Sequence, residues 1–194
     1  MNRIVNLLFV SLIMLSGVSC KNEVKQDFLS LAAERYSVRS FDSTPVGRSK
    51  IDGILKAAQL APTAINAQPQ KIYVIESPEM MAKMNEISPC MYGAPHCFVV
   101  CYDSEVAARK GEYGSWGEVD ATIVITQMML EAQELGVGTC LVGRFEPDGL
   151  VEALNLPHNI KPVLMMPFGY PAENAEPSPR HSDRKSLEET VEFL

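Results

Sequence analysis

The longest helical pattern in the chain runs from Glu118 to Leu135 and constrains the fold more than any other segment. Its apolar side chains lie on most faces of the expected helix: Val119, Ala121, Ile123, Val124, Met128, Met129, Ala132 and Leu135. A helix that is apolar nearly all round is buried, either in the core of its own chain or against a partner. Gly136 follows it directly and suits a C-terminal cap. We therefore expect this helix in the core or at a subunit interface.

Composition indicates one globular domain. The chain has 194 residues, of which 46% are hydrophobic and 21% charged, enough to fill a core and too apolar for disorder. The formal charge is −7. Removing residues 1 to 19, whose only charged side chain is Arg3, makes it about −8. Such a chain is not expected to bind nucleic acid.

Residues 1–19 have the pattern of an export signal. Arg3 supplies the positive end, and the apolar core from Ile4 to Leu15 is too short to span a bilayer. Small residues then precede Cys20, which resembles a bacterial lipoprotein signal, although Gly17 stands where leucine is usual. We expect Cys20 to be lipidated, residues 20–27 to be a linker, and the protein to lie membrane-anchored in the cell envelope, on the periplasmic side in a Gram-negative cell. An ordinary cleaved signal and an uncleaved anchor are the alternatives.

The remaining cysteines and the histidines give no metal-binding pattern. Cys90, Cys97, Cys101 and Cys140 match neither a zinc framework nor a C-x-x-C pair. We expect them to pack in the core as small hydrophobes, and one disulfide among them stays open in an oxidising compartment. His96, His158 and His181 are scattered. No metal site is predicted.

The segment RYSVRSF, residues 35–41, is the first candidate binding site. In an extended segment Arg35, Ser37 and Arg39 share one face. Two guanidiniums with a hydroxyl between them suit an anionic, planar ligand such as flavin mononucleotide (FMN), because one can clamp a phosphate and the other can reach a ring carbonyl. A solvated loop whose arginines cover nearby carboxylates is the alternative.

A second candidate is the loop from Pro62 to Pro69. Asn66 and Gln68 are two apart in it, and an amide can both donate and accept, as the edge of a flavin ring requires. A turn whose Asn bonds its own backbone is the alternative.

The other elements follow from periodicity. Helices are expected near 28–33, from Ser49 to Pro62 with Ser49 and Asp52 as a capping box, and at 78–85 and 147–154, and residues 187–194 are a last amphipathic segment. Strands are expected at 71–76, 97–102 and 162–168. Residues 110–117 are predicted to be a mobile loop whose aromatics either border a ligand or fill the core. Residues 136–145 are rich in small residues but lack a Rossmann fingerprint. Arg180, Arg184 and Lys185 matter only if the tail returns to the ligand.

Five ordered blocks together resemble the nitroreductase family of FMN-dependent oxidoreductases. They are RYSVRSF, APTAINAQP with KIYVIE, VDATIVITQMMLEAQELGVGTCLVGRF, FGYPAE and DRKSLEE, and they cover about residues 28–194, which we take as the folded domain. The resemblance implies an α+β fold in three α/β/α layers, with a mainly antiparallel central sheet flanked by helices. It also implies an intertwined homodimer with FMN at the subunit interface, where the 118–135 helix would pack.

The same resemblance implies roles for individual residues. Arg35 and Ser37 would hold the FMN phosphate with Tyr36 beside them, and Arg39 would face the N1/O2 edge. Asn66 and Gln68 would line the ring and ribityl chain. The backbone N–H groups of Leu141, Val142 and Gly143 would lie near N5, and Arg184 would return to the phosphate. Some family members carry a glutamate where this chain has Gly143.

The implied activity is a two-step electron transfer through FMN. A nicotinamide nucleotide, NADH or NADPH, or another donor reduces FMN, and a nitro compound, quinone or similar small molecule is the acceptor. Export puts the electron donor in question, because well-known members are cytosolic. The alternative function is a lipid-tethered flavin-binding protein without turnover of its own.

Overall fold

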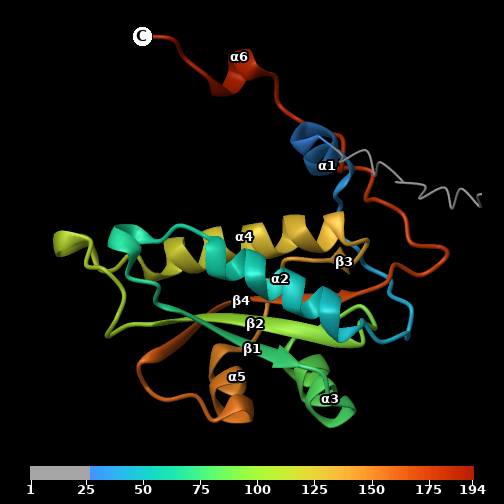
Figure 1. Ribbon diagram of the computed structural model, residues 1–194, viewed down its shortest axis with the longest axis horizontal. Helices are drawn as coiled ribbons and strands as arrows, with labels where there is room; N and C mark the ends of the chain where they lie inside the picture. The colour runs from blue at the N-terminus through green and yellow to red at the C-terminus, as the bar shows by residue number, and fades with distance from the viewer. Residues whose placement is uncertain (1–26) are drawn as a thin grey trace, which may run out of the picture.

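A four-stranded antiparallel sheet forms the centre of the computed structural model, which describes residues 27–194 (Figure 1). Its strand order is β1-β2-β4-β3. The strands are β1 (Gln70–Ile75), β2 (His96–Asp103), β3 (Gly138–Thr139) and β4 (Ile160–Gly169). Residues 1–26, which include the predicted signal and Cys20, lie outside the described residues.

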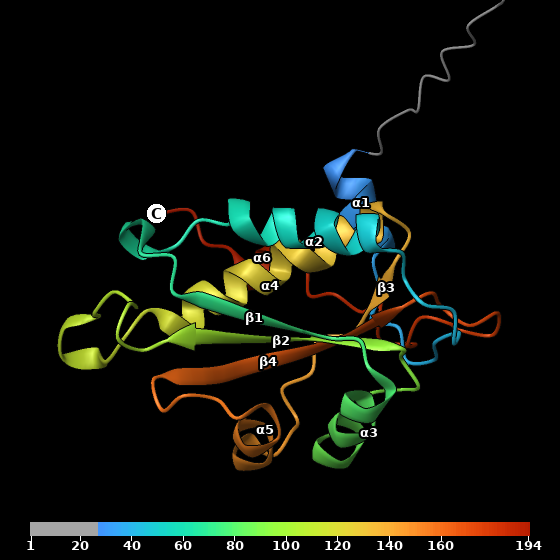
Figure 2. The ribbon, with the colours of Figure 1, turned by 60° about the horizontal axis from the view of Figure 1, so that its bottom comes forward.

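Helices cover both faces of this sheet. The helices α2 (Arg48–Leu60) and α4 (Gly117–Glu134) pack on one face, and α3 (Pro78–Ile87) and α5 (Pro147–Leu154) pack on the other, as Figures 1 and 2 show from two directions. The arrangement is the predicted three-layer α+β fold.

The central strands separate two apolar clusters. Phe98 and Val100 of β2 face the α2 and α4 side, where the rings of Phe98 and Phe168 stack at 4.2 Å between centroids. Cys97, Val99 and Cys101 face the α3 and α5 side, because alternate strand residues point to opposite faces.

Burial raises the pKa of both Cys97 and Cys101 to about 12. These cysteines therefore pack as small hydrophobes, as predicted, and all four described cysteines are free thiols.

Helix α4 buries the side that faces the sheet. Its buried residues are Gly117, Asp120, Ala121, Val124, Ile125, Met128 and Ala132. Val119, on the other side, is 37% exposed. The chain's own core therefore buries the predicted helix on the side that faces the sheet, and not on the other side. Gly117 lies against the Tyr102 ring so closely that an added Cβ would overlap it.

One local prediction was wrong. The helix α2 begins at Arg48 after Gly47, which offers no side-chain cap, and Asp52 accepts a hydrogen bond from Arg48 Nε at 2.8 Å. Asp52 is therefore an ion-pair partner one turn along the helix, and Ser49 with Asp52 forms no capping box. A capping box does occur at Ser186 and Glu189. It begins α6 (Leu187–Thr190), a single turn within the amphipathic segment 187–194.

Three short elements lie outside the main layers: α1 (Phe28–Glu34) and the 3₁₀ turns η1 (Ala64–Asn66) and η2 (Gly111–Tyr113). The turn η2 occupies the segment predicted as a mobile loop, and a bridge between Arg109 and Ser115 closes that loop. Lys110 lies over the Trp116 ring, with Nζ 4.4 Å from the centroid.

Within residues 27–194 no helix has the length and hydropathy to cross a membrane.

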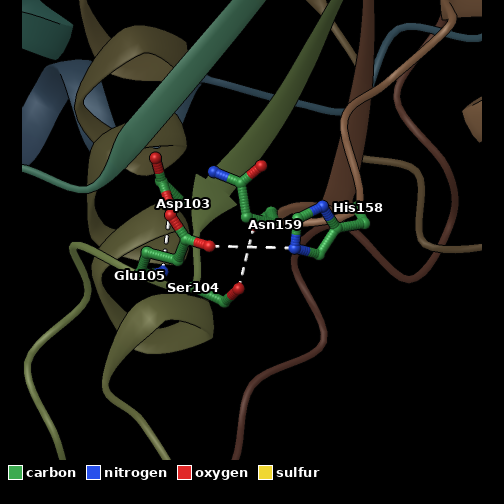
Figure 3. A network of polar contacts seen from close by, with 5 residues as sticks. All are labelled: Asp103, Ser104, Glu105, His158 and Asn159. Atoms are coloured by element: carbon green, nitrogen blue, oxygen red, sulfur yellow. Dashed lines mark hydrogen bonds and ion pairs between the residues drawn. The ribbon is translucent and has the colours of Figure 1, made fainter.

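A polar network joins the end of β2 to the turn before β4 (Figure 3). Ser104 Oγ donates to Asn159 O at 3.0 Å, and Glu105 N–H donates to an oxygen of Asp103 at 2.9 Å. His158 Nε2 lies 3.7 Å from Glu105 Oε1. The network lies where β2 ends and β4 begins.

Candidate functional site

The segment 35–39 is fixed to the edge of the sheet. Ser37 forms a parallel bridge with Thr139 of β3, and Val38 N–H donates to Thr139 O at 2.9 Å. Val38 is buried, at 1% exposure, and occupies the inner side. Because alternate side chains of an extended segment point in opposite directions, Ser37 and Arg39 point away from that core. The sheet edge thus presents the predicted binding face.

The C-terminal tail returns to this segment. A ring nitrogen of His181, Nε2, lies 3.1 Å from Ala33 O, and the His181 and Tyr36 rings meet edge to face at 6.3 Å. Together the two segments line a pocket of about 420 Å³. Its lining residues are Arg35, Tyr36, Ser37, Arg39, Ser178, Arg180, His181 and Arg184. Five of the predicted binding residues are therefore neighbours.

Positive charge dominates the pocket. Burial lowers the pKa of Arg35, and the neighbouring Arg184 charge lowers it further. Arg39 Nη1 donates to Ser37 O at 3.2 Å, and Arg184 Nη1 donates to Asp183 O at 2.8 Å, so both guanidiniums bond neutral carbonyl oxygens. An anion in the pocket would relieve the repulsion between these cations and accept charge-assisted hydrogen bonds. A phosphate group has the charge and the oxygens for this.

The segment after β3 interacts with residues of the pocket through Cys140. Burial raises the pKa of the Cys140 thiol, while the Arg39 charge and the Ser37 hydroxyl act in the opposite direction. Further along, Val142 N–H donates to Met165 O at 2.8 Å. Of the three backbone N–H groups predicted to face the flavin, the one of Val142 is therefore already used. Those of Leu141 and Gly143 have no acceptor within the part of the chain that the structure describes.

Asn66 and Gln68 lie away from the arginine pocket. Their loop is attached to the start of α4, where Ala64 N–H donates to Asp120 Oδ1 at 2.9 Å. The pocket lies beyond the other end of α4, at Thr139. A helix of 18 residues is about 27 Å long at 1.5 Å per residue. One chain therefore does not bring these amides to the arginine pocket.

Three residues of the pocket are absent from the predicted site: Ser178, Arg180 and His181. Arg180 could be suspected from the sequence, because a cation late in the chain can return to a phosphate. Ser178 and His181 could not be suspected from the sequence, since neither stands at a recognisable spacing. Among the described residues, no group of histidine, cysteine and carboxylate side chains could hold a metal ion.

Comparisons with known proteins agree on one family. The model of the nitroreductase family matches residues 32–90 and 82–170. The NADPH-dependent oxidoreductase of Staphylococcus epidermidis is 31% identical over 170 residues, which cover 77% of this chain and 68% of the relative. The FMN reductase [NAD(P)H] of Bacillus subtilis is 29% identical over 163 residues, covering 74% of this chain and 66% of the relative.

Solved structures agree as well. A nitroreductase family protein from Clostridium difficile superimposes with a TM-score of 0.81 at 34% identity, covering 87% of this chain and 98% of that one. An FMN-dependent nitroreductase from the same species gives a TM-score of 0.72 at 25% identity, covering 85% and 98%. The fold and the pocket define an α+β protein with an arginine-lined pocket at the sheet edge. The chain belongs to the nitroreductase family.

Proposed function

We propose that this protein is an FMN-dependent oxidoreductase that takes electrons from a nicotinamide nucleotide and passes them to a small acceptor such as a nitro compound or a quinone. The observation that carries the proposal is the pocket in which Arg35, Ser37, Arg39 and Arg184 gather. The names of the relatives, an FMN reductase and an FMN-dependent nitroreductase among them, support FMN and a nicotinamide donor.

The residues of the pocket fit the phosphate end of FMN. Arg35 and Arg184 supply charge-assisted donors, and the hydroxyl of Ser37 supplies a further donor from the same side. Burial and then the neighbouring Arg184 charge lower the pKa of Arg35, and the closeness of these two cations favours a dianion at this position. When bound, FMN supplies the hydride-transfer chemistry.

The other predicted residues would act on the ring. The charge of Arg39 acts on the Cys140 thiol beside the pocket, so it can also oppose negative charge at the N1/O2 edge. The free N–H groups of Leu141 and Gly143 would donate near N5. Gly143 leaves room there, because an added Cβ would meet only Leu164 Cδ2, at 3.7 Å. We assign no residue as a general acid or base.

A second copy would complete the site. Asn66 and Gln68 lie at the far end of α4, so they reach an arginine pocket only from another subunit. Apolar surface supports such a dimer: a groove of about 510 Å³ lies between α1, α2 and α4. Phe28 and Leu60 at its edge are 64% and 69% exposed, and Phe193 in the tail is 98% exposed. A homodimer would cover these side chains.

An absorbance spectrum and one mixing experiment test the function. The purified chain, reconstituted with FMN, should be yellow and should lose its visible flavin absorbance when mixed anaerobically with NADH or NADPH. Bleaching followed by reoxidation with a nitro compound or a quinone supports the oxidoreductase. Persistent colour with every donor would favour a flavin-binding protein without turnover. A colourless protein would contradict both.

We also propose that the protein is tethered to a membrane through a lipidated Cys20, in the cell envelope. The support is the sequence pattern of residues 1–20, which lies outside the described residues. Cys20→Ser should fold normally but move from the detergent phase to the aqueous phase in a partitioning experiment, because the lipid supplies the attachment. Continued partitioning of the variant with membranes would contradict the tether.

A further inference from the structure

Asp120 is a buried carboxylate that the proposed function does not use. It lies in the first turn of α4 and is 1% exposed. Its Oδ1 accepts a hydrogen bond from Ala64 N–H at 2.9 Å. Its Oδ2 is also buried and has no hydrogen-bond partner among the described residues. Burying a carboxylate with an unfilled oxygen costs free energy, so a buried carboxylate of this kind calls for an explanation.

The loop that Asp120 holds is strained. Ile65, Asn66 and Gln68 have positive φ angles of 50°, 57° and 50°. Left-handed backbone is unfavourable for residues other than glycine, and most of all for a β-branched residue such as Ile65. Conformations of this kind persist only where the surrounding structure fixes them, and they cluster at functional sites.

The contact with Asp120 is the attachment that fixes the interior of this loop. The turn bonds from Asn66 N–H to Thr63 O (2.9 Å) and from Gln68 N–H to Thr63 Oγ1 (3.0 Å) stay within the loop. Among the hydrogen bonds of the described residues, the bond between Ala64 and Asp120 alone joins residues 64–68 to another element.

We propose that Asp120 is a positioning residue that holds the 64–68 loop in its strained form, so that the amides of Asn66 and Gln68 are presented to the flavin. The inference rests on the proposed function for its ligand, but the positioning itself is a property of the chain without FMN. The bond from Ala64 sets where the loop begins, and the left-handed residues then set the direction of both amides.

The first test measures the loop without FMN. In Asp120→Ala, backbone amides of residues 64–68 should exchange hydrogen at least tenfold faster than in the parent, while amides of β2 keep the parent rates. Asp120→Asn keeps an acceptor oxygen and should stay within about threefold of the parent. Glu118→Gln, an exposed acid in the same helical turn, is the matched control and should leave the loop unchanged. Unchanged exchange in Asp120→Ala would overturn the inference, whether or not the protein binds FMN.

The second test separates positioning from general stability. FMN affinity should fall at least tenfold in Asp120→Ala. Replacing Asn66 and Gln68 together by alanine should weaken FMN binding strongly in the parent, but by a much smaller factor in the Asp120→Ala background, because the amides are already misplaced there. Equal factors in the two backgrounds would overturn the inference. A parent that binds no FMN would contradict the proposed function, and hydrogen exchange would then decide the positioning alone.

A variant on the other side of the bond covers the case in which Asp120→Ala fails to fold. Ala64→Pro deletes the donor N–H and leaves Asp120 in place. Thr63 has φ −131° and ψ 156°, which suits a residue before proline, and proline is tolerated at the first position of a helical turn. FMN affinity should fall at least tenfold in this variant too. Parent-like affinity in a folded Ala64→Pro would overturn the inference.

Discussion

At the scale of single residues, the two arginines of the RYSVRSF segment should act differently. Arg35 is half-buried beside Arg184 in the pocket, whereas Arg39 is exposed and its charge influences the Cys140 thiol. If Arg35 binds phosphate, Arg35→Ala should weaken the binding of oxidised and of reduced FMN by similar factors. The reduction potential of the bound FMN should then stay nearly constant. If Arg39 faces the ring edge, Arg39→Ala should lower the potential by roughly 30 mV, which equals about 1.4 kcal/mol for a two-electron couple.

A redox titration of each variant at saturating flavin is the measurement. A charge-assisted hydrogen bond is worth about 1.5 to 3 kcal/mol, so affinity should fall in both variants and only the potentials distinguish them. A potential in Arg39→Ala equal to that of the parent would remove the electrostatic role of Arg39.

His96 predicts how stability depends on pH. The ring is 6% exposed, and its Nε2 accepts from Val46 N–H at 3.1 Å, which requires a neutral ring with its proton on Nδ1. Burial lowers the pKa of His96, and the Glu76 charge opposes this only in part. The unfolded chain therefore binds a proton more readily below pH 6.5, so folding stability should fall as the pH decreases from that value.

Urea unfolding between pH 7.5 and 5.5 measures this effect. One proton changes the free energy of unfolding by at most about 1.4 kcal/mol per pH unit. His96→Gln should remove the dependence, and His158→Gln, at an exposed histidine, should keep it. The same slope in His96→Gln and the parent would assign the dependence to other groups.

The single residues show what sequence can and cannot predict about a site. Arg35, Ser37 and Arg39 were predictable because alternate residues of an extended segment share a face. Ser178 and His181 were not, because their place in the pocket depends on the path of the tail. The use of the Val142 N–H by Met165 O was equally hidden, since it depends on the register of two segments distant in sequence.

At the scale of elements, the contact between α4 and β2 depends on Gly117. An added Cβ there would overlap the Tyr102 ring. Gly117→Ala should therefore lower the free energy of unfolding by about 1 to 3 kcal/mol, the usual cost of overpacking, although alanine is the better helix former. Chemical denaturation measures it.

A matched glycine supplies the control. Gly149 lies inside α5, where an added Cβ would meet Ile87 Cγ1 at an ordinary 3.5 Å. Gly149→Ala should be neutral or stabilising by up to about 1 kcal/mol. In the double variant Gly117→Ala/Tyr102→Ala, the ring that the added Cβ would overlap is gone. The double variant should therefore lose less free energy of unfolding than the sum of the losses in the two single variants. Parent-like stability in Gly117→Ala would show that the helix can shift away from β2.

Elements were predictable where the periodicity was long and regular. The buried run of β2, the long helix α4 and the helix from Pro147 to Leu154 were all expected from their patterns. The predicted capping box at Ser49 was wrong, because the pattern cannot show that Asp52 pairs with Arg48 instead. The two-residue strand β3 is too short for any periodicity, yet it holds the segment that carries the arginines.

At the scale of the whole molecule, we expect an obligate homodimer. A second subunit would bury three apolar features of the surface: the groove between α1, α2 and α4, the exposed Phe28, and the exposed tail residue Phe193. The interface should exceed roughly 2,000 Å² in total, the class of permanent interfaces. Light scattering at micromolar concentration should give twice the chain mass. A monodisperse monomer that still binds FMN would contradict the dimer and the shared site together.

The layer arrangement was expected from the resemblance of the five blocks, because no periodicity alone gives the strand order. The separation of Asn66 and Gln68 from the arginine pocket was not expected. It depends on α4 lying between them, which only the three-dimensional arrangement shows.

The strand order also determines when this chain can fold. Partners across β1 and β2 are 22 to 32 residues apart, as in Ile75 with Cys97 and Gln70 with Tyr102. Partners across β2 and β4 are 57 to 72 residues apart, as in Asp103 with Ile160 and His96 with Phe168. Such non-local pairing folds slowly, because long loops must close before the contacts that reward closure can form. Until residue 169 has been synthesised, the apolar run of β2 has an open edge, and the nascent chain is exposed to aggregation for that time.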